Sequence, residues 1–454
     1  MVKIVEDSMG MVEIPDDKLY GAFTQRTLNT CSISGHRVPL ELISAILLIK
    51  KACAIANCKL GKLSEDKKSA ILGSIDLLLT GNFNDNFVLD IFQNGAGTST
   101  HMNVNEVIAS ISRQKFNATV HQNDDVNMSQ STNDVMPSAI NISCSLQIRN
   151  HLLPSLQAMF AVLSAHAEEW KDVVKIGRTH LQDAVPMTLG QEFSAYAQQI
   201  NKCIGRCFRA IEILGEIPMG GTAVGTGLNS PKGFSALVIE EINGETELNF
   251  TVAVNKFCEQ SSKDSLVEIS GIVNSMTSAL AKIACDLKLL SSGPRTGLRE
   301  LSLPETQAGS SIMPGKVNPI MCEMLLQACH YINGMMLTVL LGANNGELQL
   351  NTAMPLLAYA LLDSINILAN CANNFSRYCL KDLRPNVKIL DENSKKSLML
   401  ITAIAPLIGY EMAASIVKEA IEQEKTIAEI LRDKHLLDPK SIDSLCDPKN
   451  MLAS

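Results

Sequence analysis

Five long stretches of apolar and small residues restrict the fold of this chain more than any other feature. Apolar side chains recur there at helical spacing, which predicts helices over about residues 136–169, 189–215, 262–291, 319–344 and 354–380. At about 1.5 Å per residue, each helix would be roughly 40 Å long. Two parts, Ile269–Ala281 and Met324–Leu341, are apolar around most of their circumference, so these helices must be buried on more than one side.

Helices of this length in a parallel array leave little room for a sheet. The five segments therefore predict an all-α fold with a central five-helix bundle. One copy of such a bundle would leave an apolar stripe exposed to water. We therefore expect several copies of the chain to associate through it.

Shorter elements are expected on both sides of the long helices. The pattern before them predicts a short strand around Val12–Ile14 and helices over Leu40–Leu60 and Ser64–Leu79, with Ser64 as the N-cap. Beyond about residue 386 it predicts helices near Ser394–Pro406, Tyr410–Glu422 and Thr426–Asp433. We expect three domains: an N-terminal domain over 1–134, the long-helix bundle over 135–385, and a small helical domain over 386–454.

One loop in the bundle carries an unusual set of chemical groups. Residues 309–319 read Gly-Ser-Ser-Ile-Met-Pro-Gly-Lys-Val-Asn-Pro. Its glycines free the backbone, and Pro319 suits the first turn of a helix, where amide groups attract anions. A serine among converging amides, with Lys316 nearby, can be stabilised as an alkoxide and act as a base. The alternative is a plain turn between two helices.

Three further polar blocks have matching chemistry although they lie far apart in the sequence. They are Thr98–Glu106, which enters a helix at about Asn103, then His121–Asp134 and Ile176–Ala184. Each block could simply cap a helix. Their density of hydroxyl and amide groups favours instead a cradle for carboxylates, and long helices can bring such blocks together.

The four blocks together resemble the fumarase/aspartase superfamily, whose signature is GSSxMPxKxNP, in order and spacing. The resemblance runs from about Asp7 to Leu452 and is strongest to class II fumarases, with aspartate ammonia-lyase as a close relative. It implies a three-domain, tetrameric helical fold whose active sites are shared between subunits. The family eliminates water or an amine from a C4 dicarboxylate through an aci-carboxylate dianion, an intermediate that needs preorganised donors and positive charge.

The resemblance also implies roles for particular residues. Ser310 would be the base, Lys316 and Asn318 would grip the carboxylates, and His180, held by Glu323, would polarise the departing water. His121, Asn123 and Asp124 match a second dicarboxylate-binding stretch of fumarases. The implied catalytic residues are Ser310, His180, Lys316 and Glu323, and the implied substrate contacts are Thr98, Ser131, Thr132, Asn133, Thr179, Ser311, Asn318, His121, Asn123 and Asp124.

Three positions depart from the family pattern. Met128 stands in place of a lysine, which removes a positive charge near the cradle. Ala96 replaces a serine, and His101 replaces an asparagine. None of these changes touches the implied base or the implied leaving-group residue.

The choice between fumarase and aspartase depends on local blocks. Gln130–Asp134 and Leu348–Asn351 look aspartase-like, whereas Gly221–Phe234, Pro448–Leu452 and His180 look fumarase-like. We expect reversible hydration of fumarate to L-malate, with aspartate deamination as the alternative. A non-catalytic helical scaffold is a third possibility, but it predicts loss of the catalytic set, which is present.

Charge and cysteine usage narrow the function further. A net charge of −8 and a pI near 5.6 argue against nucleic acid as a partner. The thirteen cysteines form no CxxC pair, which predicts free thiols in a reducing compartment. No metal-ligand spacing and no dinucleotide fingerprint occurs. We therefore expect a cytoplasmic enzyme with no metal, no cofactor, no signal peptide and no membrane span.

Overall fold

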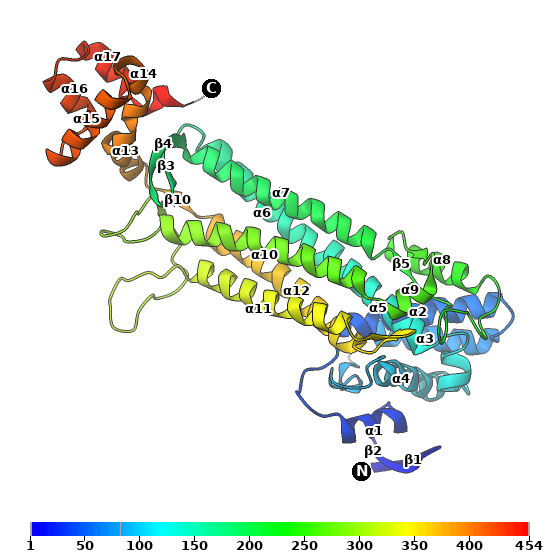
Figure 1. The fold of residues 1–454 in the computed structure, drawn as a ribbon. Helices are drawn as coiled ribbons and strands as arrows, with labels where there is room; N and C mark the ends of the chain where they lie inside the picture. Colours follow the sequence, from blue (N-terminus) through cyan, green and yellow to red (C-terminus); the bar gives the residue numbers. More distant parts are fainter. Residues whose placement is uncertain (1, 82, 453–454) are drawn as a thin grey trace. The chain divides into compact units, whose positions relative to one another are not determined.

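The computed structural model describes residues 2–81 and 83–452. Helices account for most of this chain (Figure 1), and the described strands pair only into two-stranded sheets. The predicted mostly helical fold is therefore confirmed. Residues 1, 82 and 453–454, which belong to the predicted terminal domains, lie outside the described residues.

The chain divides into two compact units, each assembled from separate stretches. Unit 1 comprises Met1–Pro154, Gly205–Thr277 and Cys329–Asn370, and unit 2 comprises Ser155–Ile204, Ser278–Ala328 and Cys371–Ser454. The units combine stretches that are separate in the sequence, whereas the three expected domains are continuous segments. The division into three domains therefore stays a prediction.

All five long helical segments are present. Helices α7 (Leu189–Ile213), α10 (Asp264–Leu290) and α11 (Ile320–Ala343) begin and end within two residues of the predicted bounds. Helix α12 (Met354–Phe375) continues into a π-helical turn, Ser376–Leu380.

The first long segment is not the single regular helix that the sequence predicts. It consists of α5 (Thr132–Gln147) and α6 (Leu153–Glu169), joined by a π-helical turn at Ile148–Leu152. Pro154 lies just after this turn. Because proline has no N–H and its ring crowds the preceding turn, it disturbs the regular α-helical ladder at this place.

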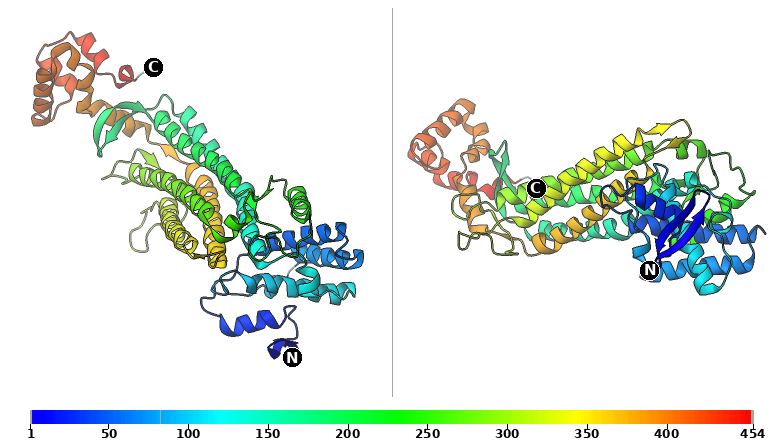
Figure 2. Two further views of the ribbon diagram at one scale, coloured as in Figure 1. Left: turned by 45° about the vertical axis from the view of Figure 1, so that its right-hand side comes forward. Right: turned by 90° about the horizontal axis from the view of Figure 1, so that it is seen from below.

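Unit 1 is built around helix α2 (Leu40–Lys59). Helices α3 (Glu65–Thr80), α5 and α8 (Phe234–Thr246) pack against α2, and α4 (Thr98–Phe116) packs against α3 (Figures 1 and 2). The buried residues of α2 lie on most sides of the helix, as its low content of polar residues requires.

Smaller elements complete unit 1. Strands β1 (Val2–Asp7) and β2 (Gly10–Pro15) form an antiparallel hairpin, so the predicted strand is part of β2. Arg26 of helix α1 (Ala22–Thr30) donates two hydrogen bonds to the carboxylate of Asp7. The predicted cap Ser64 accepts a hydrogen bond from the backbone of Lys67. The stretch Gly205–Thr277 of unit 1 also contains helix α9 (Lys256–Ser261) and the parallel pair of β5 (Glu216–Ile217) and β6 (Thr251–Val252). The stretch Cys329–Asn370 contains the hairpin of β8 (Gly346–Glu347) and β9 (Leu350–Asn351).

Unit 2 contains the antiparallel hairpin of β3 (Val174–Thr179) and β4 (Gln182–Thr188). An aromatic group lies in its core: the Trp170 ring stacks on His166, with ring centroids 4.2 Å apart, and meets Phe193 edge-on. A second small pairing joins β7 (Leu301–Ser302) to β10 (Arg384–Pro385).

The chain ends in short helices packed on an isoleucine-rich cluster. The helices on this cluster are α14 (Ala405–Ile408), α15 (Tyr410–Glu422), α16 (Ile427–Asp433) and α17 (Pro439–Leu445), whereas α13 (Val387–Lys396) packs against β3. The predicted helix over Ser394–Pro406 is wrong, because α13 ends at Lys396 and Ser397 caps a separate 3-10 turn. The helices predicted over Tyr410–Glu422 and Thr426–Asp433 are confirmed by α15 and α16, with Thr426 as the N-cap of α16.

Two of the described helical stretches are long and apolar enough to cross a membrane by length and composition alone. Met354–Leu380 is 67% buried over its most apolar window, as a core helix of a folded protein would be. Ile320–Ala343 is only 28% buried over the same kind of window. Much of the apolar surface of α11 is therefore exposed on a single chain.

Candidate active site

The serine loop, residues 309–319, lies in unit 2 between β7 and α11 and contains no regular helix or strand. The Ser310 hydroxyl accepts hydrogen bonds from the backbone N–H groups of Ile312, at 3.3 Å, and Met313, at 2.9 Å. Two N–H dipoles aimed at one oxygen stabilise negative charge on it. The loop therefore already holds the Ser310 oxygen where an alkoxide would be favoured.

The ends of the serine loop are tied together by its own polar groups. Lys316 Nζ donates to Asn318 Oδ1 at 2.9 Å, and the Asn318 amide donates to the carbonyl of Gly309. Gly309 is required here, because a Cβ at this position would lie 1.7 Å from the carbonyl oxygen of Lys316. The three groups keep the predicted carboxylate-binding residues beside the serine.

Thr179 and His180 lie at the exposed tip of the β3–β4 hairpin. Thr179 pairs with Gln182, so His180 and Leu181 form a two-residue turn, with φ of +56° and +59°. Positive φ at both central residues is the geometry that matches the twist of a tight hairpin. Neither residue is a glycine, so the turn holds local strain of the kind that concentrates at functional sites.

A buried charge cluster connects this hairpin to the segment before the serine loop. Glu300, which is fully buried, forms ion pairs with Lys175 at 2.9 Å and Arg178 at 2.5 Å. Lys175 also pairs with Glu192 at 2.7 Å. Two cations and two carboxylates balance each other in the interior, as buried charges must. Sequence reasoning did not single out Glu300, whose only signal is a carboxylate just ahead of an apolar strand.

In unit 1, the N-termini of α4 and α5 carry the other implied substrate contacts. Helix α4 begins at Thr98 after Gly97, whose φ is +85°, so the helix start predicted near Asn103 is five residues too late. Helix α5 begins with a capping box, in which Ser131 and Asp134 each bond the other's backbone. Such helix N-termini attract anions.

Residues around the α5 cap are further fixed from outside the helix. The buried carboxylate of Asp134 accepts hydrogen bonds from the backbone N–H groups of Gly220 at 3.1 Å and Thr222 at 2.9 Å. Asn133 donates to the carbonyl of Ala223 at 2.7 Å. Burial raises the pKa of Asp134 to about 6, although these N–H groups oppose the shift.

Lys50 lies beneath this cap and is not among the predicted site residues. This α2 lysine is 1% exposed, and its ammonium is 2.5 Å from His101 Nε2 on α4. It also donates to Asn127 at 3.0 Å and Gln130 at 2.9 Å. The other ring nitrogen of His101 is 2.8 Å from the Thr132 hydroxyl. A detectable signal was that Lys50 shares a helical face with apolar residues.

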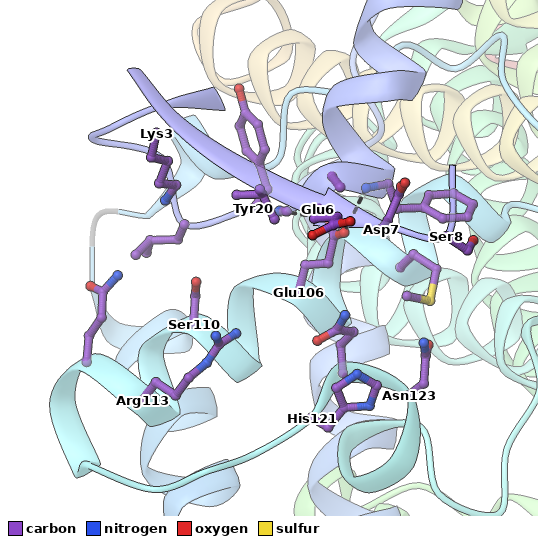
Figure 3. Close-up of a pocket in the computed structure, with 18 residues that line it drawn as sticks. Lys3, Glu6, Asp7, Ser8, Tyr20, Glu106, Ser110, Arg113, His121 and Asn123 are labelled. Atoms are coloured by element: carbon purple, nitrogen blue, oxygen red, sulfur yellow. Dashed lines mark hydrogen bonds between the residues drawn. The ribbon is translucent and has the colours of Figure 1, made fainter. Parts of the chain in front are cut away.

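His121 and Asn123 line a separate cavity of about 680 Å³ in unit 1 (Figure 3). Its wall also includes Lys3 of the N-terminal hairpin and Arg113 of α4. Asp124 does not line the cavity, but its carboxylate is 3.1 Å from His121 Nδ1. The cavity therefore places two of the three predicted residues among side chains of both charges, since Glu6, Asp7 and Glu106 line it as well.

The predicted pairing of Glu323 with His180 has no counterpart in these contacts. Across the described residues, no hydrogen bond or ion pair joins Glu323 to His180, so that pairing stays a prediction. Within residues 2–81 and 83–452, no three histidine, cysteine, aspartate or glutamate side chains cluster as metal ligands would.

Two protein-family models match the chain. One describes a lyase family and covers residues 10–334, and the other describes the fumarase C C-terminus and covers residues 400–453. The first of these models includes the serine loop, the N-termini of α4 and α5, and the β3–β4 hairpin.

Individual relatives match over nearly the whole chain. The class II fumarate hydratase of Chlamydia pneumoniae is 42% identical over 455 residues, covering 99% of each chain, and that of Myxococcus xanthus is 42% identical over 456 residues, covering 99% of this chain and 98% of its own. The crystal structure of class II fumarase from Schistosoma mansoni superposes with a TM-score of 0.96, at 37% identity and 99% coverage of both chains.

Proposed function

This chain belongs to the class II fumarate hydratase family, a family of carbon–oxygen lyases, and we propose that it interconverts fumarate and L-malate with Ser310 as the base. The aspartate ammonia-lyase alternative is not favoured, because the full-length relatives are class II fumarate hydratases. The scaffold alternative is opposed by the presence of Ser310, Lys316 and His180.

The observation that carries the catalytic assignment is the pair of N–H groups on the Ser310 oxygen. In the direction from malate, the Ser310 alkoxide takes a proton from C3, and the electrons left at C3 delocalise into the adjacent carboxylate as an aci-carboxylate dianion. The C2–O bond then breaks, the C2–C3 double bond forms, and the hydroxyl leaves as water after taking a proton from His180. Ser310 then gives the C3 proton to solvent and His180 takes one up, so both recover their starting forms. Fumarate and water are the products.

The charges needed by the dianion come from the same loop. Lys316 and Asn318 are bonded to each other at 2.9 Å, so both can turn onto one carboxylate as a unit, with Ser311 as a further donor. A fixed ammonium and amide stabilise the charge that develops in the transition state more than that of the substrate. Thr179 and His180 would act at the departing hydroxyl, with Glu323 orienting the imidazole.

The substrate's carboxylates would also be held by the cradle of unit 1. Thr98, Ser131, Thr132 and Asn133 lie at the N-termini of α4 and α5, where hydroxyl donors and helix amides favour anions. The cavity with His121 and Asn123 supports a second dicarboxylate site, in which Lys3 and Arg113 would be the cationic contacts, although Glu6, Asp7 and Glu106 also line the wall.

Absorbance of fumarate in the ultraviolet tests the reaction directly. With L-malate as the sole substrate, the purified full-length chain should produce fumarate, and with L-aspartate it should produce none. Turnover of aspartate without turnover of malate would reject the proposal in favour of ammonia elimination. Absence of both activities would favour the scaffold reading.

The assembled form is proposed to be a homotetramer whose active sites draw on several subunits. Leu337, Leu340 and Leu341 of α11 are 56%, 41% and 60% exposed on the single chain, and their burial between copies would remove this apolar surface from water. Light scattering should give a mass about four times that of one chain. The thirteen cysteines, which form no CxxC pair, are consistent with a reducing, cytoplasmic location.

A further inference from the structure

The buried Lys50 ammonium is satisfied without any carboxylate partner. Its three protons match three acceptors, which are His101 Nε2, Asn127 Oδ1 and Gln130 Oε1. An ammonium has no lone pair, so it can only donate to His101. The shared hydrogen bond therefore fixes which nitrogen of the imidazole carries the proton.

The direction of the hydrogen bonds follows from this constraint. With Nε2 accepting from Lys50, the neutral imidazole carries its proton on Nδ1 and donates it to the Thr132 oxygen, 2.8 Å away. Thr132 then keeps its own O–H for an outside acceptor. Burial and the nearby Lys50 charge lower the pKa of His101 well below its usual value, which keeps the ring neutral.

A neutral Lys50 would reverse the direction of both hydrogen bonds of His101. The amine would accept from His101 Nε2–H, the bare Nδ1 would accept from the Thr132 hydroxyl, and Thr132 would present only lone pairs to a ligand. Lone pairs repel a carboxylate. The protonation state of Lys50 thus decides whether Thr132 can bind an anion.

We propose that Lys50 and His101 are positioning residues for substrate binding, which turn the Thr132 hydroxyl outward as a donor to a substrate carboxylate. The proposal rests on the placement of Thr132 in the substrate cradle. It gives a role to His101, which departs from the family's asparagine. It also places the Lys50 ammonium behind the substrate cradle, near the position where Met128 replaces the family's lysine and a positive charge is lost.

The surroundings of Lys50 decide how this arrangement responds to pH. The titratable groups facing it are His101 on α4, Asp134 on α5 and Cys53 on α2 itself. Three acidic residues on the neighbouring helices α3 and α8 pair with other lysines: Asp76 and Glu245 with Lys51, and Glu241 with Lys59. Burial lowers the pKa of Lys50 to about 7, so the ammonium is lost as the pH rises through neutrality.

A pair of adjacent lysines provides the test. Lys50→Met removes the buried ammonium while filling its space, and Lys51→Met removes the same charge from a lysine that faces Glu245 instead. We expect Lys50→Met to raise KM for L-malate about ten-fold at pH 6, with kcat within about three-fold, because a hydrogen bond to a charged group is lost. Lys51→Met should leave KM unchanged.

The pH profile separates positioning from a merely structural role. In the wild-type protein, KM should rise between about pH 6 and pH 8, as Lys50 loses its proton, and in Lys50→Met this slope should disappear. Asp134 and Lys50 each shift the other's pKa, so both profiles are also measured in an Asp134→Asn background, where the remaining difference reports Lys50 alone. Equal KM values and equal slopes in the two proteins would overturn the inference.

A double-mutant cycle tests whether Lys50 acts through the hydroxyl. In a Thr132→Val background, Lys50→Met should have no further effect on KM, and additive effects would reject the chain of contacts. Wild-type protein without malate turnover would count against the proposed function alone. Nitrogen-15 NMR of labelled histidine then still decides: His101, identified by His101→Gln, should be the Nδ1–H tautomer at pH 6 and the Nε2–H tautomer at pH 8, and one tautomer throughout would refute the switch.

Discussion

The α5 cap of unit 1 and the serine loop of unit 2 both satisfy their polar groups, but by opposite routes. Lys50, His101, Thr132 and Asp134 are buried and bonded to partners from several separate segments. The loop residues Ser310, Lys316 and Asn318 are exposed or half-buried, and within the described part of the chain their side chains bond only to groups of residues 309–318.

The α5 cap is therefore a binding surface whose geometry is set by the fold, and the serine loop is a catalytic segment that can move. Displacing the α5 cap would break hydrogen bonds to α2, α4 and the 220–222 turn. Displacing the serine loop as a unit would break none of its internal bonds. Changes in the loop should therefore affect turnover with little effect on stability, whereas changes at the cap should affect binding and folding.

The largest effect is expected from Ser310→Ala. Loss of the base should lower kcat by about 10³-fold or more, while the two freed N–H groups turn to water because the loop is exposed. The thermal unfolding midpoint and the assembled mass should stay at wild-type values. Thr306→Ala, an exposed hydroxyl of the same loop region, is the matched control and should keep full turnover. Substantial activity in Ser310→Ala would remove the serine from its role.

Gly309→Ala tests whether the closed shape of the loop matters. The new Cβ would collide with the carbonyl of Lys316, so the two ends of the loop must separate and the Asn318 contact must break. A displacement of this size should lower kcat about 10²-fold. Gly315→Ala is the control, since no atom lies within 4 Å of its Cβ position and only its φ of +76° is strained. Similar losses in both variants would show that backbone strain, and not loop closure, governs turnover.

Thr132→Val tests the cap by removing one hydroxyl at nearly constant volume. KM for L-malate should rise about ten-fold, because one donor to a carboxylate is lost, and kcat should change by less than about three-fold. Ser138→Ala removes a buried hydroxyl two turns further along the same helix, where it bonds only the backbone. A KM effect equal in both variants would indicate general damage to α5.

Sequence patterns were sufficient to predict most helices. They were insufficient to predict the places where the backbone departs from a regular α-helix. The bounds of α15 were predicted without error because apolar spacing continues from Tyr410 to Glu422. The π-helical turns at Ile148–Leu152 and Ser376–Leu380 keep the same side-chain pattern as an α-helix to within one residue. Periodicity therefore cannot reveal them.

The candidate site shows the same limit. Polar blocks in loops stand out in a sequence, and the serine loop and the Thr179–His180 turn were found that way. Lys50 was not, because a lysine in an apolar helix ordinarily extends its charge to water along the surface. Its burial depends on Asn127, Gln130 and His101, which come from two other segments, and only the fold brings those acceptors together.

Asp134→Asn should have the most specific effect, a change in how the free energy of unfolding depends on pH. The folded-state pKa of Asp134 is raised from 3.8 to about 6, so its contribution to stability is full below pH 4 and is lost as the pH rises through 6. Two pKa units correspond to about 3 kcal/mol. Relative to Asp134→Asn, the wild-type free energy of unfolding should fall by up to this amount between pH 4 and pH 7, as chemical denaturation at each pH would show. A constant difference would mean that the N–H groups of Gly220 and Thr222 fully offset the burial of the charge.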